Sequence, residues 1–120
     1  MRLVRFDASI GHPIAQFGSR EAVMTGIQRG AGDYQLGCLR LGPGGVLGYH
    51  RATTHQLLLV VAGEGRVRAG DEPPRPIVAG QAAYWQPGEE HETTTDTGLT
   101  ALVLEADTLD PAQFLRELES

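Results

Sequence analysis

The sequence GGVLGYHRATTHQLLLVVAG, residues 44–63, decides the fold of this chain when it is considered together with GQAAYWQPGEEHETTT, residues 80–95. The first stretch places His50 after a glycine-rich segment and before Gln56, which opens the most apolar run of the sequence. The second places His91 just beyond a Pro-Gly turn. Each histidine stands beside turn residues that separate short strands, so the pattern predicts a β-rich domain.

Length and cysteine content limit the size and setting of the protein. The chain has 120 residues, enough for one domain whose core needs no disulfide or structural metal. Cys38 is the single cysteine, so no disulfide forms within the chain; we expect a reducing cytoplasm and a buried, apolar role for this side chain. The longest apolar run, residues 57–62, is far shorter than the roughly 20 residues that cross a bilayer, so we expect no membrane segment.

The charge pattern excludes two classes of partner. The net charge is −5, and the ten basic residues, all arginine, are scattered along the chain. Nucleic acids and anionic membranes require clustered positive charge. We therefore expect neither to be a partner.

Glycine and proline divide the rest of the sequence into short apolar segments. Residues 34–41 alternate as a strand does, and residues 56–62 are so apolar that we expect a strand buried on both faces. Glycines at residues 42–45 and 63–65 are expected to end these strands. Residues 22–27 fit a strand or a helical turn, and we favour the strand. Further strands are expected at residues 1–6, 77–78, 82–86, 91–95 and 99–105, a spacing that indicates an all-β sandwich or barrel.

The C-terminal tail has the features of a short helix. Asp110 can cap its first turn, Pro111 suits that turn, and Phe114 and Leu118 form one apolar stripe through Glu119. We expect this helix to pack outside the sheet.

Residues 44–63 resemble the first motif of the cupin family, which is a glycine, five residues, His-x-His, three or four residues, Glu, six residues and a glycine. Gly44, His50 and Gly63 match this motif in register. Ala52 stands at the position of the second histidine, and Gln56 stands at the position of the glutamate. The chain therefore has the glycines and the first histidine of the motif.

Residues 80–95 resemble the second cupin motif, which is a glycine, five residues, Pro-x-Gly, two residues, His, three residues and Asn. Gly80, Gly88 and His91 match in register. Gln86 replaces the proline, and Thr95 replaces the asparagine. Two of the four ligand positions of the family are therefore histidine in this chain.

The resemblance implies a fold and an assembly. It implies an all-β fold, a small antiparallel jelly-roll β-barrel with the short helix outside it, and one cupin domain over residues 1–120, as in small single-domain bacterial cupins. Cupins carry their site in the barrel mouth and commonly pair through an edge strand and an outer sheet face. We therefore expect a homodimer.

Strand alternation and the two motifs select the candidate site residues. His50 shares a strand face with Gln56, and His91 shares one with the threonines that follow it. Gln86 is held extended by the next proline and can turn its amide to the pocket. The candidate metal ligands are His50, Gln56 and His91, and the candidate ligand pocket adds Gln86, Thr93 and Thr95.

Other polar and aromatic residues near the motifs have two interpretations each. His55 has the opposite parity to Gln56 and reaches the pocket through a bulge at residues 53–54; otherwise it is a polar residue at a strand entrance. Glu89, Glu90 and Glu92 either supply a carboxylate beside His91 or are solvated. His12 has no partner at a suggestive spacing, and Tyr84 and Trp85 are expected in the core or at a dimer contact.

Three functions remain open from the sequence. The first is a pocket that binds a small polar molecule, with a loosely held divalent ion (Zn, Ni, Cu, Fe or Mn) and metal-assisted or acid/base chemistry. The second is a metal-free binding or sensing module for a sugar-like or amide-bearing ligand, and the third is a structural homodimeric scaffold. The candidate set lacks a carboxylate to offset the charge of an ion, which weakens metal binding. Whether the protein is an enzyme stays open, and no substrate is implied.

Overall fold

Antiparallel β-strands form nearly all the regular structure of this chain. The computed structural model describes residues 1–30 and 33–118. In chain order the elements are two short 3-10 turns, η1 and η2, among eight strands: η1 (Ala8–Ile10), β1 (His12–Pro13), η2 (Gln16–Gly18), β2 (Arg20–Arg29), β3 (Tyr34–Arg51), β4 (His55–Ala69), β5 (Arg75–Val78), β6 (Ala82–Trp85), β7 (Glu90–Thr94) and β8 (Leu99–Ala106). Within the described residues, no helix is long and apolar enough to span a membrane.

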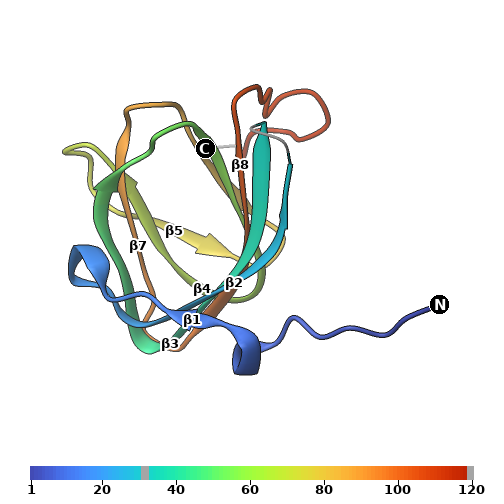
Figure 1. The fold of residues 1–120 in the computed structure, drawn as a ribbon. Helices are drawn as coiled ribbons and strands as arrows, with labels where there is room; N and C mark the ends of the chain where they lie inside the picture. The colour runs from blue at the N-terminus through green and yellow to red at the C-terminus, as the bar shows by residue number, and fades with distance from the viewer. Residues whose placement is uncertain (31–32, 119–120) are drawn as a thin grey trace.

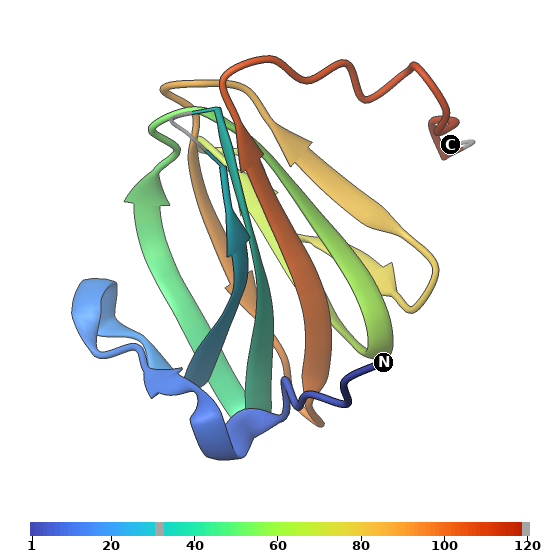
Figure 2. The same cartoon turned by 45° about the vertical axis from the view of Figure 1, so that its right-hand side comes forward.

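The strands form one continuous sheet that curves into two facing layers. Two long strands, β3 and β4, run through both layers. The first half of β3 pairs with β8 and with most of β2, and its second half pairs with β7. β4 pairs with β8 and β6 along its first half and with β5 and β7 along its second half. The strands consequently curve around a common interior (Figure 1), with β8 lying between the first halves of β3 and β4 (Figure 2).

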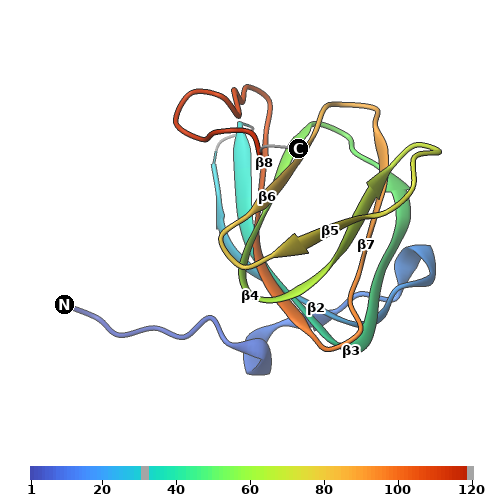
Figure 3. The same cartoon turned by 180° about the vertical axis from the view of Figure 1, so that it is seen from behind.

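The antiparallel all-β prediction is confirmed, but complete closure of a barrel is not seen. Among the described residues, β1 pairs with β2 alone, and β5 and β6 each pair with β4 alone. Seen from behind, β5 and β6 lie along β4 (Figure 3). The strand favoured at residues 22–27 is confirmed as part of β2.

Glycines bend the long strands instead of ending them, so the expected strand ends at residues 42–45 and 63–65 are wrong. β3 and β4 continue through both segments. Gly63 has a φ of +80°, and a Cβ placed on it would lie 2.2 Å from the carbonyl oxygen of Gly98. A residue without a side chain is needed here because the backbone is left-handed and another backbone passes close by. Each glycine segment therefore lets one strand pass from one layer to the other.

The core lies between the layers and is filled by alternate residues of the long strands. Leu39, Leu58 and Ala101 are fully buried in one cluster with Trp85. In β4, Leu57 and Leu58 are both buried, so this part of the strand is covered on both faces as predicted, whereas Val61 is exposed. Cys38 is buried as well, as predicted.

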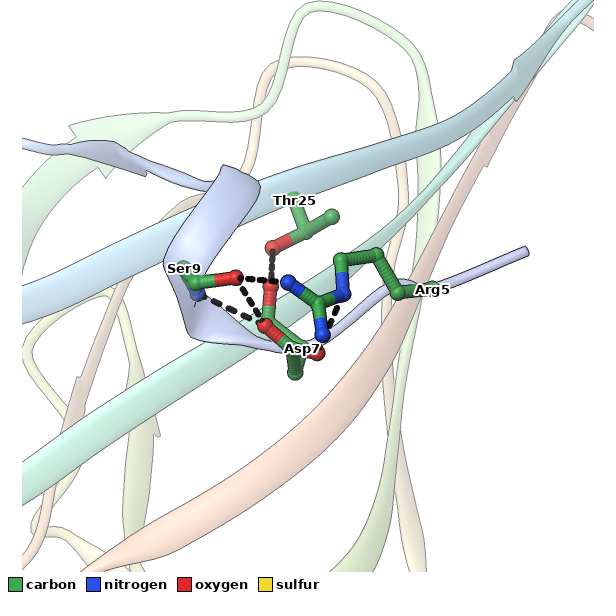
Figure 4. Close-up of polar contacts among 4 residues, drawn as sticks. All are labelled: Arg5, Asp7, Ser9 and Thr25. Atoms are coloured by element: carbon green, nitrogen blue, oxygen red, sulfur yellow. Dashed lines mark hydrogen bonds and ion pairs between the residues drawn. The ribbon is translucent and has the colours of Figure 1, made fainter.

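The first six residues do not form the edge strand expected from their alternation. They extend away from the body of the molecule, and Leu3 is 90% exposed (Figure 1). The chain becomes fixed at Asp7, whose carboxylate accepts the Ser9 backbone N–H at 2.9 Å and pairs with Arg5, and whose carbonyl accepts the Thr25 hydroxyl at 3.4 Å (Figure 4). Before this anchor, the structure offers no neighbouring strand among the described residues to pair with.

The predicted C-terminal helix is absent from the part of the tail that the structure describes. Asp110 does accept the backbone N–H of Ala112 at 2.9 Å, but only a turn follows. Phe114 is 86% exposed, and the tail leaves the sheets after β8 (Figure 2). So short a helix needs an apolar face packed on the protein, and this one has no packing partner there. The expected end at Glu119 lies outside the described residues.

Candidate functional site

His50 and His91 lie directly opposite each other across the β3–β7 pair. They are register partners, and their ring centroids are 4.3 Å apart with an angle of 57° between the rings. Directly opposite residues on one face of an antiparallel pair are in side-chain contact. A register shift in β3 between Leu47 and His50 precedes this contact.

The backbone fixes the tautomer of both imidazoles. The Nδ1 atom of His50 lies 2.7 Å from the carbonyl oxygen of Gly48, and Nδ1 of His91 lies 3.2 Å from that of Glu89. A carbonyl oxygen accepts hydrogen bonds and donates none, so each Nδ1 carries a proton and donates it. The Nε2 atom of each neutral ring therefore carries a lone pair.

His91 is buried as a neutral base. Its side chain is 0% exposed, and its Nε2 atom has no hydrogen-bond partner in the described part of the protein. Burial lowers the pKa of His91 to about 4; the hydrogen bond to Glu89 opposes this shift, and the nearby His50 adds to it. At neutral pH the ring is therefore an uncharged hydrogen-bond acceptor.

Thr93 adds a second unpartnered polar group on the same strand. It follows His91 by two residues on β7 and is fully buried, and its hydroxyl has no partner among the described residues. Alternate residues of a strand share a face. The inward face of β7 thus carries a free acceptor and a free hydroxyl.

Aromatic rings stack on both sides of the histidine pair. Trp85 stacks on His91 with centroids 4.1 Å apart and rings at 20°. Phe17 stacks on His50 at 4.7 Å and 16°. We name Phe17, His50, His91 and Trp85 the ring row. Trp85 lies in the core, as expected, and also forms one end of the row.

Sequence reasoning missed Phe17. Its neighbours in the sequence give no functional signal, and it lies against His50 in a segment that is held to β3 by the hydrogen bond from the Gly48 backbone N–H to the Ser19 hydroxyl, at 3.1 Å. This contact joins segments far apart in the sequence. No spacing within one strand reveals it.

Gln56 borders the ring row from β4. It is buried and is the register partner of Trp85 in β6. It has the same parity as the buried Leu58, so its amide lies on the inward face. Ala52, at the position of the second family histidine, is buried and adds only a methyl group.

Three other candidates are engaged elsewhere or exposed. His55 lies on the other face of β4, where its Nδ1 atom is 2.7 Å from the hydroxyl of Tyr84. The Thr95 hydroxyl donates to the carbonyl of Glu64 at 2.6 Å and accepts the N–H of Gly98 at 2.9 Å. Gln86 is exposed.

The acidic residues around His91 have partners of their own or face solvent. Glu89 accepts the backbone N–H of Gln86 at 3.1 Å, and Glu92 pairs with Arg68 at 3.2 Å. Glu90 is exposed, and His12 is exposed on β1. Within residues 1–30 and 33–118, no three His, Cys, Asp or Glu side chains are grouped to hold a metal ion. The donor set for an ion is therefore two imidazoles and an amide.

Solved structures similar to this one share its fold at low sequence identity. A predicted oxalate decarboxylase from Thermotoga maritima has a TM-score of 0.74 and 19% identity, over 86% of this chain and 98% of that chain. The polyketide cyclase RemF from Streptomyces resistomycificus has a TM-score of 0.74 and 19% identity, over 97% and 89%. KdgF from Halomonas sp. has a TM-score of 0.65 and 20% identity, over 75% and 82%. At these identities the likeness is one of fold alone.

The family assignment comes from the sequence match. No curated protein matches the chain. Residues 37–106 match the family described as the cupin domain, a span that exceeds half of the chain and contains both motifs. The chain therefore belongs to the cupin family.

Proposed function

We propose that this cupin binds a small polar molecule at His50 and His91. The observation that carries the proposal is the Nε2 atom of His91, which is buried beside a second imidazole and has no hydrogen-bond partner in the described structure. A buried polar atom without a partner costs about 1–3 kcal/mol. A ligand that donates a hydrogen bond to this nitrogen recovers that energy, so the fold supplies part of the affinity.

The chemistry of the surrounding groups favours a ligand that is a hydrogen-bond donor. His91 is neutral because burial holds its pKa near 4, so its Nε2 atom accepts a hydrogen bond from a ligand and donates none at neutral pH. Thr93 offers a hydroxyl and Gln56 an amide, and these two groups both donate and accept. A molecule with hydroxyl or N–H groups fits this set.

A divalent metal ion is the second candidate ligand. Histidines that bind metals commonly donate their other ring N–H to a carbonyl oxygen, as both Nδ1 atoms do here. His50, His91 and Gln56 would hold the ion, whether Zn, Ni, Cu, Fe or Mn, with water completing its shell. A bound ion would supply Lewis-acid polarisation of a ligand oxygen. The missing carboxylate costs on the order of several kcal/mol at an effective dielectric constant near 20, so we expect loose binding.

The similar structures do not indicate which reaction, if any, this chain catalyses. They are described as a predicted oxalate decarboxylase, a polyketide cyclase and KdgF, which are different proteins on one fold. One fold commonly hosts many functions, so the ligand must be argued from the site.

A screen with matched variants tests the binding of a small molecule. We would record the thermal unfolding of the untagged protein with a panel of small polar metabolites, since ligand binding raises the apparent stability. We expect at least one hydroxyl- or N–H-bearing compound to stabilise the wild type and His12→Ala but not His91→Ala. If no compound does so, or if His91→Ala responds equally, the scaffold interpretation replaces our proposal.

Metal binding is tested separately through Trp85, the one tryptophan of the chain. It stacks on His91, so Cu²⁺ or Ni²⁺ held there should quench its fluorescence. We expect saturable quenching that His50→Ala and His91→Ala each abolish and His55→Ala retains. Equal quenching in all the variants would contradict metal binding at this site.

A further inference from the structure

Phe17 covers one face of the His50 imidazole. The two rings are nearly parallel with centroids 4.7 Å apart, while the His91 ring is tilted against His50 and Trp85 stacks behind it. Trp85 and His91 are buried, whereas Phe17 is 57% exposed. Phe17 therefore stands at the solvent end of the ring row.

The backbone of Phe17 is in a conformation that a bulky residue rarely adopts. Its φ is 63° and its ψ is 24°, in the left-handed region. This conformation is unfavourable for a residue with a Cβ, and such residues gather at functional sites. The cost is similar in size to the gain from one aromatic stack. The free energy gained by stacking Phe17 on His50 is therefore largely offset by the cost of its backbone conformation. An open arrangement in which Phe17 leaves both would differ little in free energy.

The segment that carries Phe17 is fixed to the sheet at both ends, and between them it holds a hydrogen bond of its own turn, from the Ser19 backbone N–H to the carbonyl of Gln16 at 3.1 Å. Ile14 donates its backbone N–H to the carbonyl of Ala22 at 2.9 Å, and the Ser19 hydroxyl accepts the N–H of Gly48 at 3.1 Å. Gly18, with a φ of +67°, has nothing within 4 Å of a Cβ position. η2 lies beside the second half of β3 (Figures 1 and 3). Residues 15–18 can thus swing outward without loss of either anchor.

Gly48 allows the segment to lie close to β3. A Cβ placed on Gly48 would lie 1.5 Å from the carbonyl oxygen of Phe17. Any side chain at this position would push the segment away from His50. The closed arrangement therefore depends on a glycine two residues before the histidine that it covers.

We propose that Phe17 is a displaceable cover over His50, and that the ligand that displaces it carries a flat, unsaturated ring with a hydroxyl or N–H group. This proposal rests on the function proposed above. The group that replaces a phenyl ring on the flat imidazole must itself be flat to recover the stacking contact. Its donor group would serve the unpartnered Nε2 atom of His91, which lies beside His50. Two surface hollows, of about 240 Å³ and 180 Å³, are lined by residues outside the ring row and offer no such contact.

Chemical modification of the histidines tests the cover without any ligand. Diethyl pyrocarbonate acylates accessible imidazoles, and mass spectrometry resolves the four histidines of the chain. Phe17→Asn removes the ring and keeps a residue that tolerates left-handed backbone, whereas Phe17→Tyr keeps the ring. We expect the modification rate of His50 to rise roughly two- to tenfold in Phe17→Asn, the equivalent of one lost stack, and to stay near the wild-type value in Phe17→Tyr.

His12 and His55 are the internal controls for this measurement. His12 is exposed on β1 and His55 lies on the other face of β4, so their rates should not change in either variant. Gly48→Ala should raise the His50 rate as Phe17→Asn does. If the modification rate of His50 did not change in Phe17→Asn, the proposal that Phe17 covers His50 would be wrong.

A matched pair of ligands tests the ligand class. Catechol and cis-cyclohexane-1,2-diol carry the same two hydroxyls, on a flat and a puckered ring. We expect catechol to shift the NMR signals of the His50 and His91 rings at severalfold lower concentration than the diol. In Phe17→Asn its dissociation constant should fall roughly two- to tenfold, because no phenyl ring competes for His50.

The outcomes separate this proposal from the function on which it rests. If both compounds bind equally and both need His91, the polar site stands and the flat-ring class is wrong. If catechol leaves the ring signals unchanged, the flat-ring class is also wrong. If the metabolite screen finds no ligand that depends on His91 either, the proposed function falls as well.

Discussion

Among individual residues, burial decides the chemistry of the candidate site. His91 and Thr93 are fully buried and their polar atoms are unpartnered in the described structure, whereas the equally buried Thr95 uses its hydroxyl in two hydrogen bonds. Strand alternation places Thr93 and Thr95 on one face from the sequence alone. It cannot separate them, because the partners of Thr95 come from a turn and from another strand.

The pKa of His91 predicts a pH-dependent stability for the metal-free protein. Burial lowers this pKa from 6.5 to about 4 in the folded state, so between these values the unfolded chain binds more protons. The contribution of neutral His91 to the free energy of unfolding is complete above about pH 6.5. It is lost as the pH falls towards 4, by up to roughly 3 kcal/mol. Urea denaturation at pH 7, 6 and 5 should show this loss in the wild type, and His91→Gln should lose less stability over the same range. If the free energy of unfolding fell equally with pH in the two proteins, a neutral buried His91 would be contradicted.

The two threonines of β7 form a matched pair for a test of the free hydroxyl. Thr93→Val removes an unpartnered hydroxyl, so we expect the free energy of unfolding to stay unchanged or to rise by up to about 1 kcal/mol. Thr95→Val leaves a carbonyl and an N–H without their partner and should cost about 1–3 kcal/mol. Denaturant midpoints measure both changes. A large loss in Thr93→Val would show that its hydroxyl already has a partner within the fold.

Among the secondary-structure elements, β3 and β4 bring the site together. β3 pairs with β8 in one layer and with β7 in the other, and this second pairing sets His50 opposite His91. The sequence predicts strands in these segments but places the strand ends at the glycines. Glycine both ends strands and bends them, and the choice depends on whether another backbone lies alongside, which a single sequence does not reveal.

The bend at Gly63 gives a test at the level of the strand. Gly63→Ala places a Cβ in left-handed backbone and 2.2 Å from the carbonyl oxygen of Gly98. Gly80→Ala, at a φ of +91° with nothing within 4 Å, adds the strain alone, about 1–2 kcal/mol. We expect Gly63→Ala to be clearly the more destabilising of the two in urea denaturation. Similar losses would mean that the strands separate at this point at little cost.

In the molecule as a whole, the fold is more predictable than the site. The two motifs and the regular turn spacing lead to the antiparallel fold of a cupin, and the structure and the family match agree with it. The predictions for the terminal segments are wrong because alternation and a helical stripe imply structure only where the protein offers a surface to pack against. Phe17 could not be predicted, since its contact with His50 depends on how two distant segments approach each other.

The homodimer and the single domain over residues 1–120 remain predictions. Large apolar side chains stand exposed on both terminal segments, among them Leu3, Val4 and Phe6 before Asp7 and Phe114 after β8. A second copy of the chain that covers them would bury this surface. We expect light scattering to give the mass of two chains and deletion of residues 1–6 to shift it towards one. The mass of one chain for the intact protein would contradict the dimer.

The protonation state of the His91 ring decides whether the site can accept a ligand's hydrogen bond, and long-range ¹H–¹⁵N NMR of the imidazole nitrogens observes it directly. We predict a neutral ring at pH 7 and still at pH 5, with its proton on Nδ1 and a bare Nε2. A charged ring at pH 7, or a proton on Nε2, would contradict the claim that His91 offers a ligand a buried, unprotonated Nε2 atom.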